Sequence, residues 1–178
     1  LAEDHFLLSP STLLGIHRHL FTDVFPEEIP VGKFRKVNIT KKAPVLDGDT
    51  VQYRSHFMIQ DALAYDFERE QNFSYASLTN EQKTLHAMTF LADIWQVHPF
   101  REGNTRTVAV FGIQYLRKLG FHIDNSLFSE HAAYFRNSLV FYHHHGEKQD
   151  KHFLKIFFEN LLLGKKNVLL DEDMYAKE

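Results

Sequence analysis

Apolar residues recur at helical spacing along most of the chain. The first such segment follows Ser9-Pro10, which combines an N-cap residue with a proline at the first helical position. A capping box, Thr79-Asn80-Glu81-Gln82, opens another, whose inward face is predicted to carry Leu85, Met88, Leu91, Ala92 and Trp95. The spacing predicts helices over about 10–20, 55–71, 80–97, 105–119, 126–142 and 150–163, the last between Asp150 as its cap and Gly164 as its end.

One segment, from Lys33 to Tyr53, has strand propensity instead. Asp47-Gly48 lies in its second half and is a strong signal for a two-residue hairpin turn. We therefore predict a β-hairpin within about residues 37–53, with arms near 43–46 and 49–53. Because a lone hairpin is marginal in water, it should lie on a helical body. The predicted fold class is all-α, with residues 1–178 forming a single domain that carries one small hairpin.

The composition suits a folded domain with its own core. Hydrophobic residues make up 44% of the 178 residues, and 17 residues are Phe. The lack of cysteine excludes a disulfide scaffold, a thiolate metal site and a cysteine nucleophile. A net charge of -3 argues against a nucleic-acid partner, and no apolar run approaches the roughly 18 residues of a membrane span. The acidic start is unlike a signal peptide. We expect a cytoplasmic protein, in its own cell or delivered into another.

A polar turn between two apolar helices, from His98 to Arg106, collects groups suited to phosphoryl chemistry. His98 can exchange a proton near neutral pH, and Glu102 is an oxygen ligand of the kind that Mg²⁺ prefers. Gly103 permits close approach of the backbone, and the following helix directs free N–H groups into the turn. Arg106 adds a fork-shaped donor for phosphate. Spacing alone also allows a simple helix–loop–helix corner.

The residues of this turn match a known signature. His98-Pro99-Phe100-Arg101-Glu102-Gly103-Asn104-Thr105-Arg106 closely resembles the Fic (filamentation induced by cAMP) motif: His-Pro-Phe, any residue, Asp or Glu, Gly-Asn, usually Gly or Lys, and Arg. Three further segments are similar to the family's early helix, to the approach to its flap hairpin and to its closing helix: 13–21, 34–39 and 157–164. The resemblance covers essentially the whole chain and implies a single Fic-like domain with a flap at about 37–53 and a catalytic loop at 98–106.

The resemblance implies a protein adenylyltransferase that moves AMP from ATP to a Ser, Thr or Tyr hydroxyl of a target protein. His98 would be the general base, and Glu102 would hold Mg²⁺. Phe100 would anchor the loop. The phosphates would lie in an anion cradle made by Gly103, Asn104, Thr105 and Arg106. The flap hairpin would dock the target protein by adding a strand to its free edge.

Two departures from the family pattern leave alternatives open. Thr105 stands where many members have Gly or Lys, and Ala109 stands where many have a second phosphate-binding Arg. The inhibitory Ser/Thr-x-x-x-Glu-Gly/Asn helix of the family has only partial matches, at 77–81 and 126–130. An antitoxin-like partner could provide the inhibition instead. Other Fic-type phosphotransfer, removal of AMP, or a non-catalytic binding module therefore remain alternatives.

Several other residues could be mistaken for functional ones. Three histidines, His143 to His145, look like a metal site, but neighbouring residues on a helix point in different directions, so we interpret them as a solvated helix end. His17 and His86 have apolar neighbours at helical spacing and are predicted to be packed. Core packing is also the favoured interpretation of the aromatic residues that could wall an adenine pocket beside Ser138, namely Phe135 and Tyr142.

Overall fold

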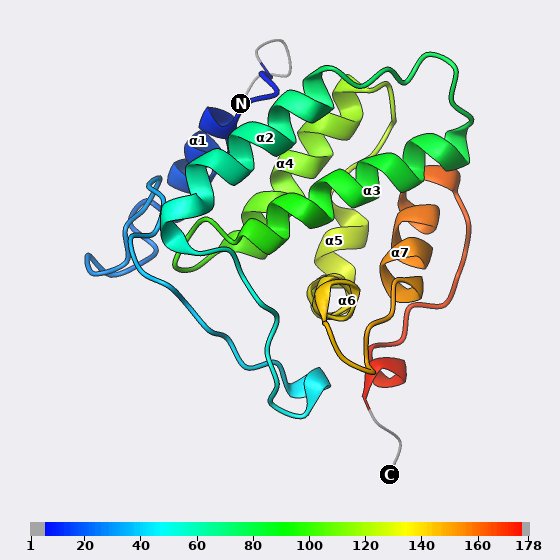
Figure 1. Cartoon of the computed structure of the whole chain (residues 1–178). Coiled ribbons are helices and arrows are strands. Elements are labelled where there is room, and N and C mark those ends of the chain that lie inside the picture. Colours follow the sequence, from blue (N-terminus) through cyan, green and yellow to red (C-terminus); the bar gives the residue numbers. More distant parts are fainter. Residues whose placement is uncertain (1–5, 176–178) are drawn as a thin grey trace.

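Helix α3 (Asn80–Val97) is at the centre of the molecule. A computed structural model describes residues 6–175, and in it α3 packs against helices on several sides (Figure 1). Its neighbours are α2 (Ile59–Gln71), α4 (Asn104–Lys118), α6 (Ala132–His143) and α7 (His152–Leu163). The remaining helices are α1 (Pro10–Phe21), α5 (Ser126–Glu130) and three short 3₁₀ turns, η2 (Pro44–Leu46), η3 (His56–Met58) and η4 (Asp171–Met174). The predicted all-α fold is confirmed.

The predicted helix ends are formed as the capping residues indicate. Ser9 caps α1 by accepting a hydrogen bond from the N–H of Ser11 at 3.2 Å. Thr79 and Gln82 make the reciprocal capping box at the start of α3. Gly164 ends α7 in the left-handed region, as predicted, but the predicted cap Asp150 lies one residue before the N-cap position, which Lys151 occupies, and Asp150 accepts from the N–H of His152 at 2.7 Å. Local sequence was therefore sufficient to locate these ends.

Two details of the helical prediction are wrong. The segment 126–142 is not one helix but α5 and α6, separated at His131, whose backbone leaves the helical region (φ −122°, ψ 38°). Its apolar pattern continues across the break because Phe128 and Phe135 pack on each other at 5.0 Å, so periodicity does not detect it. Leu85 is exposed rather than inward-facing, since it lies near the N-terminal end of α3.

The segment 37–53, which we call the flap, leaves the helical body and returns to it (Figure 1). It turns at Asp47-Gly48 as predicted, with φ of 56° and 87°. The predicted strand arms at 43–46 and 49–53 are not formed: within the described residues the flap has a single antiparallel bridge, Lys42 to Thr50. Pro44 begins the turn η2, and the adjacent residues Val45 and Leu46 are both buried, whereas a strand would direct them to opposite faces.

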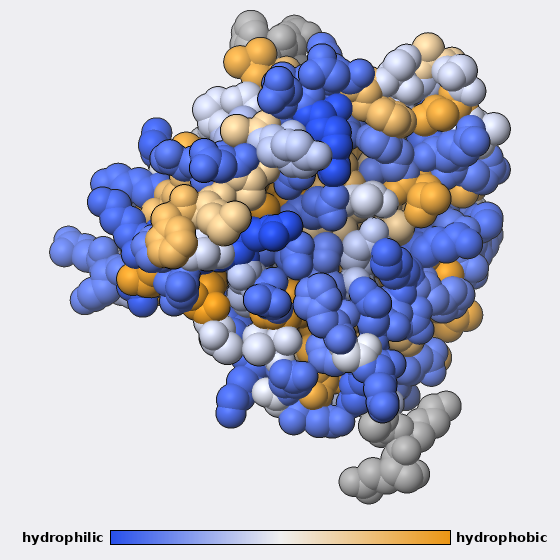
Figure 2. All heavy atoms as spheres, viewed as in Figure 1, coloured by the Kyte–Doolittle hydropathy of each residue, from blue (hydrophilic) through white to orange (hydrophobic). Residues whose placement is uncertain are grey.

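Aromatic side chains make up much of the core. One cluster joins α2, α3 and α4 through Phe67, Phe90 and Phe111. A second joins α5, α6 and α7 through Phe128, Phe135 and Phe157. The face seen in Figure 2 carries mainly hydrophilic side chains with scattered apolar ones. Between residues 6 and 175, none of the helices has the length and apolar character needed to cross a membrane.

Candidate active site

The loop that joins α3 to α4 has an unusual backbone at both ends. His98 ends α3 in the left-handed region (φ 51°), and Pro99, which disfavours helical geometry in the residue before it, stops the helix there. Gly103 is also left-handed (φ 80°), and a Cβ atom there would lie only 2.4 Å from Cε2 of Phe21. Only glycine fits this position, so α1 directly constrains how closely the loop approaches.

Asn104 holds the loop in shape from inside. Its Oδ1 accepts from the N–H of Phe100 at 2.9 Å, and its Nδ2 donates to the Phe100 oxygen at 2.8 Å. The side chain is buried. The amide group is therefore committed to the loop, and only the backbone of Asn104 remains for the anion cradle that the sequence predicts.

Phe100 and His17 fix the loop to α1. Phe100 is buried, and its ring stacks on His17 at 3.9 Å. The N–H of Gly32 donates to Nδ1 of His17 at 2.9 Å, so the proton is on Nε2, which donates to the Glu102 backbone oxygen at 3.0 Å. Burial lowers the pKa of His17, which favours this neutral form. His17 is packed, as predicted, and its bond to the backbone of Glu102 also positions that residue.

His98 has one ring nitrogen committed and one available. Its Nδ1 lies 3.1 Å from the backbone oxygen of Trp95. Because a carbonyl oxygen only accepts, Nδ1 carries the proton and Nε2 keeps its lone pair. The ring stacks on Tyr53 of the flap at 3.9 Å. Burial, followed by the charge of Lys41, lowers the pKa of His98 to about 3, so the imidazole is neutral and Nε2 can accept a proton.

Arg35, which motif reasoning did not single out, ties this loop to both ends of the flap. It is buried, and it donates from Nε to the His98 oxygen at 2.8 Å and from Nη1 to the Val37 oxygen at 2.7 Å. Nη2 donates to the Arg54 oxygen on the far side of the flap. The only sequence signal for this role was its place in the stretch 34–39 that resembles the approach to a Fic flap.

A cavity of about 390 Å³ lies above the loop, and it brings together the predicted site residues. His98, Glu102 and Arg106 line it, with Gly103, Asn104 and Thr105 between them. The flap contributes Lys41 and Tyr53, and α6 contributes Ala132, Ala133 and Arg136. The N-terminus of α4 also lies here, where the first backbone N–H groups of a helix have no intrahelical partner. Phe100 is buried and does not line the cavity.

Glu102 faces the cavity from the loop. Its Oε2 pairs with Nζ of Lys41 at 2.9 Å, and the carboxylate is half exposed. Within residues 6–175 no cluster of three His, Cys, Asp or Glu side chains could hold a metal ion. Among the described residues that line the cavity, Glu102 is the one carboxylate, which fits an Mg²⁺ ion that takes its other ligands from phosphates and water.

Arg106 has no acidic partner in the described part of the chain. Its guanidinium lies over the ring of Phe21 at 4.5 Å and is 5.9 Å from the ring of Phe25. Ala109, one turn further along α4, is buried and does not line the cavity. A positive charge in the first turn of a helix opposes the macrodipole, and an anion bound beside it would reverse this penalty.

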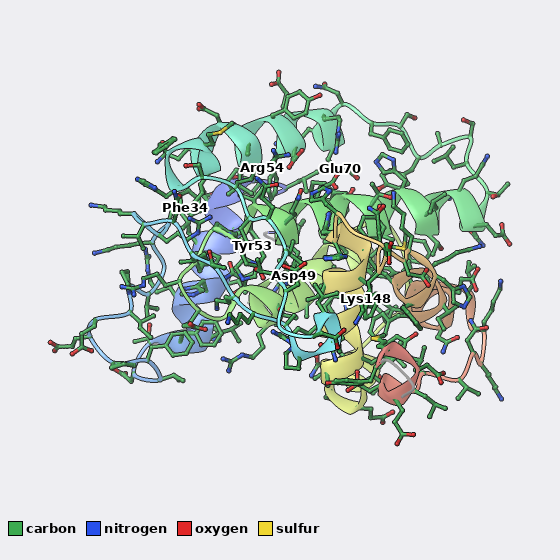
Figure 3. The ribbon with its side chains drawn as sticks, turned by 60° about the horizontal axis from the view of Figure 1, so that its bottom comes forward. Phe34, Asp49, Tyr53, Arg54, Glu70 and Lys148 are labelled. Atoms are coloured by element: carbon green, nitrogen blue, oxygen red, sulfur yellow. The ribbon has the colours of Figure 1, made fainter. Side chains whose placement is uncertain are left out.

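The flap tip is attached to the chain that follows α6. Asp49 accepts from Nε2 of His144 at 3.1 Å, and Asp47 pairs with Lys148. Figure 3 shows Asp49 and Lys148 on adjacent segments. The interpretation of His143 to His145 as a solvated helix end is therefore wrong for the first two. Both are buried. His143 donates to the Ala92 oxygen, and His144 donates to Asp49 of the flap.

The other histidine and aromatic predictions are confirmed. His86 packs face to face on Phe73 at 3.4 Å, and its Nε2 bonds to Glu70 at 2.7 Å. Phe135 and Tyr142 are buried in the core, and neither they nor Ser138 line the cavity above the loop.

The buried histidines make the fold sensitive to acid. The pKa of His98 lies at about 3 and that of His143 at about 4, both lowered chiefly by burial from 6.5. The unfolded chain therefore binds more protons below about pH 6.5, and stability is lost as the pH falls from there. Between pH 6 and 5 we expect the free energy of unfolding to fall by roughly 1 kcal/mol for each histidine. Urea titrations at both pH values measure this.

His143→Phe is the matched variant for this prediction. It keeps an aromatic ring on Trp95, which the histidine stacks on at 6.2 Å, but it removes one titrating group. The variant should therefore lose about 1 kcal/mol less stability than the wild type over the same pH range, because His98 and His17, whose pKa values burial also lowers, still titrate. An identical pH dependence in both proteins would contradict the assignment of acid sensitivity to His143.

The class of this protein follows from its similarity to a known family. The Fic/DOC family matches residues 7–116, which include the whole of the loop and most of α4, and the chain belongs to this family. The match covers more than half of the chain.

Two relatives are named as adenylyltransferases. Protein adenylyltransferase VbhT of Bartonella schoenbuchensis is 31% identical over 112 residues, which cover 61% of this chain and 21% of VbhT. Probable protein adenylyltransferase y4lH of Sinorhizobium fredii is 39% identical over 122 residues, which cover 63% of this chain and 54% of y4lH. The matched part thus spans about a fifth of the first relative and about half of the second.

Solved structures with the same fold include two Bartonella effector proteins. The N-terminal Fic domain of a Bep effector from Bartonella sp. AR 15-3 has a TM-score of 0.66 at 20% identity, over 87% of this chain and 71% of that one. BepC of Bartonella tribocorum, solved with bound AMPPNP, has a TM-score of 0.66 at 18% identity, over 86% of this chain and 74% of that one. At these identities the likeness establishes the fold alone.

Proposed function

We propose that this chain transfers AMP from ATP to a Ser, Thr or Tyr hydroxyl of a target protein and releases pyrophosphate. The observation that carries the proposal is the cavity in which Nε2 of His98, free to accept a proton, meets the N-terminus of α4 and Arg106. A proton acceptor beside an anion site is the arrangement that phosphoryl transfer to a hydroxyl requires. The names of the two adenylyltransferase relatives support the same activity.

The proposed reaction uses the loop as follows. Nε2 of His98 takes the proton of the target hydroxyl, whose oxygen attacks the α-phosphorus of ATP. The new P–O bond joins AMP to the target, and the bond to the β-phosphate oxygen breaks with release of pyrophosphate. Phosphate oxygens would accept from the first N–H groups of α4 and from Arg106. Their negative charge would also raise the pKa of His98 from its low value in the free protein, which improves it as a base.

Glu102 would hold Mg²⁺ beside these phosphates. The ion, when bound, neutralises phosphate charge and orients the leaving group. The Glu102 carboxylate is half exposed, and among the described residues it pairs with Lys41, so it can turn from the lysine to the ion without breaking a buried contact.

The flap is proposed to present the target. A groove of about 380 Å³ runs between its outgoing part, at 38–40, and its returning part, at 50–55. Tyr53 lines both this groove and the cavity of His98. A segment lying in the groove would thus reach the cavity beside the ring that stacks on the base. In the described structure no backbone–backbone hydrogen bond involves residues 38–40, so this outgoing part of the flap is available for strand addition.

Labelled ATP tests the proposal. The purified chain, with Mg²⁺ and a cell lysate as the source of target, is incubated with α-³²P-ATP and separately with γ-³²P-ATP. We expect a protein to be labelled from the α-phosphate only. Labelling from γ-³²P-ATP would indicate phosphate transfer in place of AMP transfer. Release of label from a protein that already carries labelled AMP would indicate removal of AMP. ATP that binds but labels nothing would favour a binding module.

A further inference from the structure

Arg136 is a cavity residue that the loop motif does not contain. It lies on α6, is half-buried, and lines the same cavity as His98 and Arg106. It also lies outside residues 7–116, the part of the chain that the family matches. Among the described residues it has no acidic partner, and its one hydrogen bond is donated from Nη1 to Oδ1 of Asn137 at 3.2 Å.

The neighbour of Arg136 is itself held in place. Asn137 is buried, and its Nδ2 donates to Oδ1 of Asp171 at 2.8 Å. This bond directs the amide oxygen of Asn137 toward the guanidinium. Asp171 begins η4, which packs against α6. The guanidinium is therefore partly oriented before any ligand arrives, which lowers the entropy lost when it binds one.

The charges around the cavity do not balance. Lys41 and Glu102 pair with each other, which leaves the guanidinium groups of Arg106 and Arg136 without a carboxylate. The field of Arg136 reaches the loop. After burial, Lys41 and Arg35, its charge contributes to the low pKa of His98, and it opposes the burial that raises the pKa of Tyr53 to about 12. Two uncompensated guanidinium groups on one cavity favour a ligand with more than one anionic group.

The first arginine comes from α4 and the second from α6, so they approach a ligand from different elements. On α4 itself the next turn offers only Ala109, which is buried and outside the cavity. We propose that Arg136 is a second phosphate-binding arginine and that it binds the phosphates beyond the α-phosphate, the part of ATP that leaves as pyrophosphate. This rests on the proposed function, which supplies the triphosphate. Arg136 would thus make the site selective for ATP over AMP.

Calorimetric titrations test the role of Arg136 without any transfer reaction. ATP, AMP and inorganic tripolyphosphate are titrated, with Mg²⁺, into the wild type, Arg136→Ala and Arg136→Lys. We expect Arg136→Ala to weaken ATP and tripolyphosphate about tenfold, a loss of about 1.4 kcal/mol. AMP should change less than about twofold. Arg136→Lys should lose less than Arg136→Ala, because it keeps the charge but not the fork.

Two further variants separate local from general effects. Arg106→Ala removes the arginine of the motif, and Arg18→Ala removes the same charge from an exposed position of α1, away from the cavity. The first should weaken ATP, and the second should leave ATP affinity unchanged. Thermal unfolding shows whether each variant is folded. If Arg136→Ala does not fold, the affinities of Arg136→Lys are compared with those of the wild type instead.

The outcomes separate this inference from the proposed function. Unchanged ATP affinity in Arg136→Ala, with the loss confined to Arg106→Ala, would overturn the role of Arg136 and leave the AMP transferase standing. Equal losses of affinity for ATP and AMP would overturn it as well, since they would mean that Arg136 contacts the AMP part of the nucleotide and not the phosphates beyond it. Failure of the wild type to bind ATP would count against the transferase itself. Tripolyphosphate would then decide on Arg136, supporting its role if it binds and depends on Arg136, and overturning it otherwise.

Discussion

His98→Ala is expected to abolish labelling of the target while ATP affinity stays within about threefold of the wild type. A general base contributes about 10²–10⁴-fold to a rate, and Nε2 of His98 is the proton acceptor that this cavity presents. The groups proposed to hold the phosphates, Arg106 and the N-terminus of α4, are untouched by the substitution. His98→Ala should therefore lose AMP transfer but still bind ATP.

The measurement pairs α-³²P-ATP labelling with an ATP titration on the same preparation. His145→Ala is the control, because His145 is exposed and does not line the cavity. It should label the target as the wild type does. Thermal unfolding of His98→Ala guards against loss of fold, since the histidine also stacks on Tyr53. Persistent labelling by a folded His98→Ala protein would remove His98 as the base.

Asn104→Ala is expected to have the largest effect on stability. The substitution removes both hydrogen bonds to the backbone of Phe100 and leaves a buried N–H and a buried carbonyl without partners. Each such group costs about 1–3 kcal/mol, so the free energy of unfolding should fall by roughly 2–5 kcal/mol. This is a large part of the total of about 5–15 kcal/mol that a domain possesses. ATP affinity should fall too, because the loop loses its shape.

Asn125→Ala is the matched control for this experiment. Asn125 is exposed, and although it precedes α5 its side chain makes no capping hydrogen bond. Its substitution should change stability by less than about 0.5 kcal/mol. Urea unfolding of both variants gives the comparison. A loss below about 1 kcal/mol in Asn104→Ala would mean that other contacts, such as the stack of Phe100 on His17, hold the loop without the amide.

Much of the site could be predicted because its residues are neighbours in sequence. The loop between α3 and α4 carries His98, Glu102 and Arg106 within nine residues of chain, and Pro99 ends the first helix where expected. Backbone geometry of this kind depends on each residue and the next, which sequence reports directly. The role of Asn104 was only half predicted. The sequence places Asn104 in the loop, but only the tertiary structure shows that its buried side-chain amide bonds to the backbone of Phe100 and does not face a ligand.

The sequence by itself located most of the helices and the polar loop between α3 and α4, since periodicity and capping act over a few residues. Only the tertiary structure decided which distant residues complete the site. Lys41 meets Glu102 across 61 positions, and Arg35 meets His98 across 63. It also turned part of the predicted hairpin into a 3₁₀ turn, because burying both Val45 and Leu46 outweighed their strand propensity. Contacts of this range are set by how whole helices pack, which no local pattern encodes.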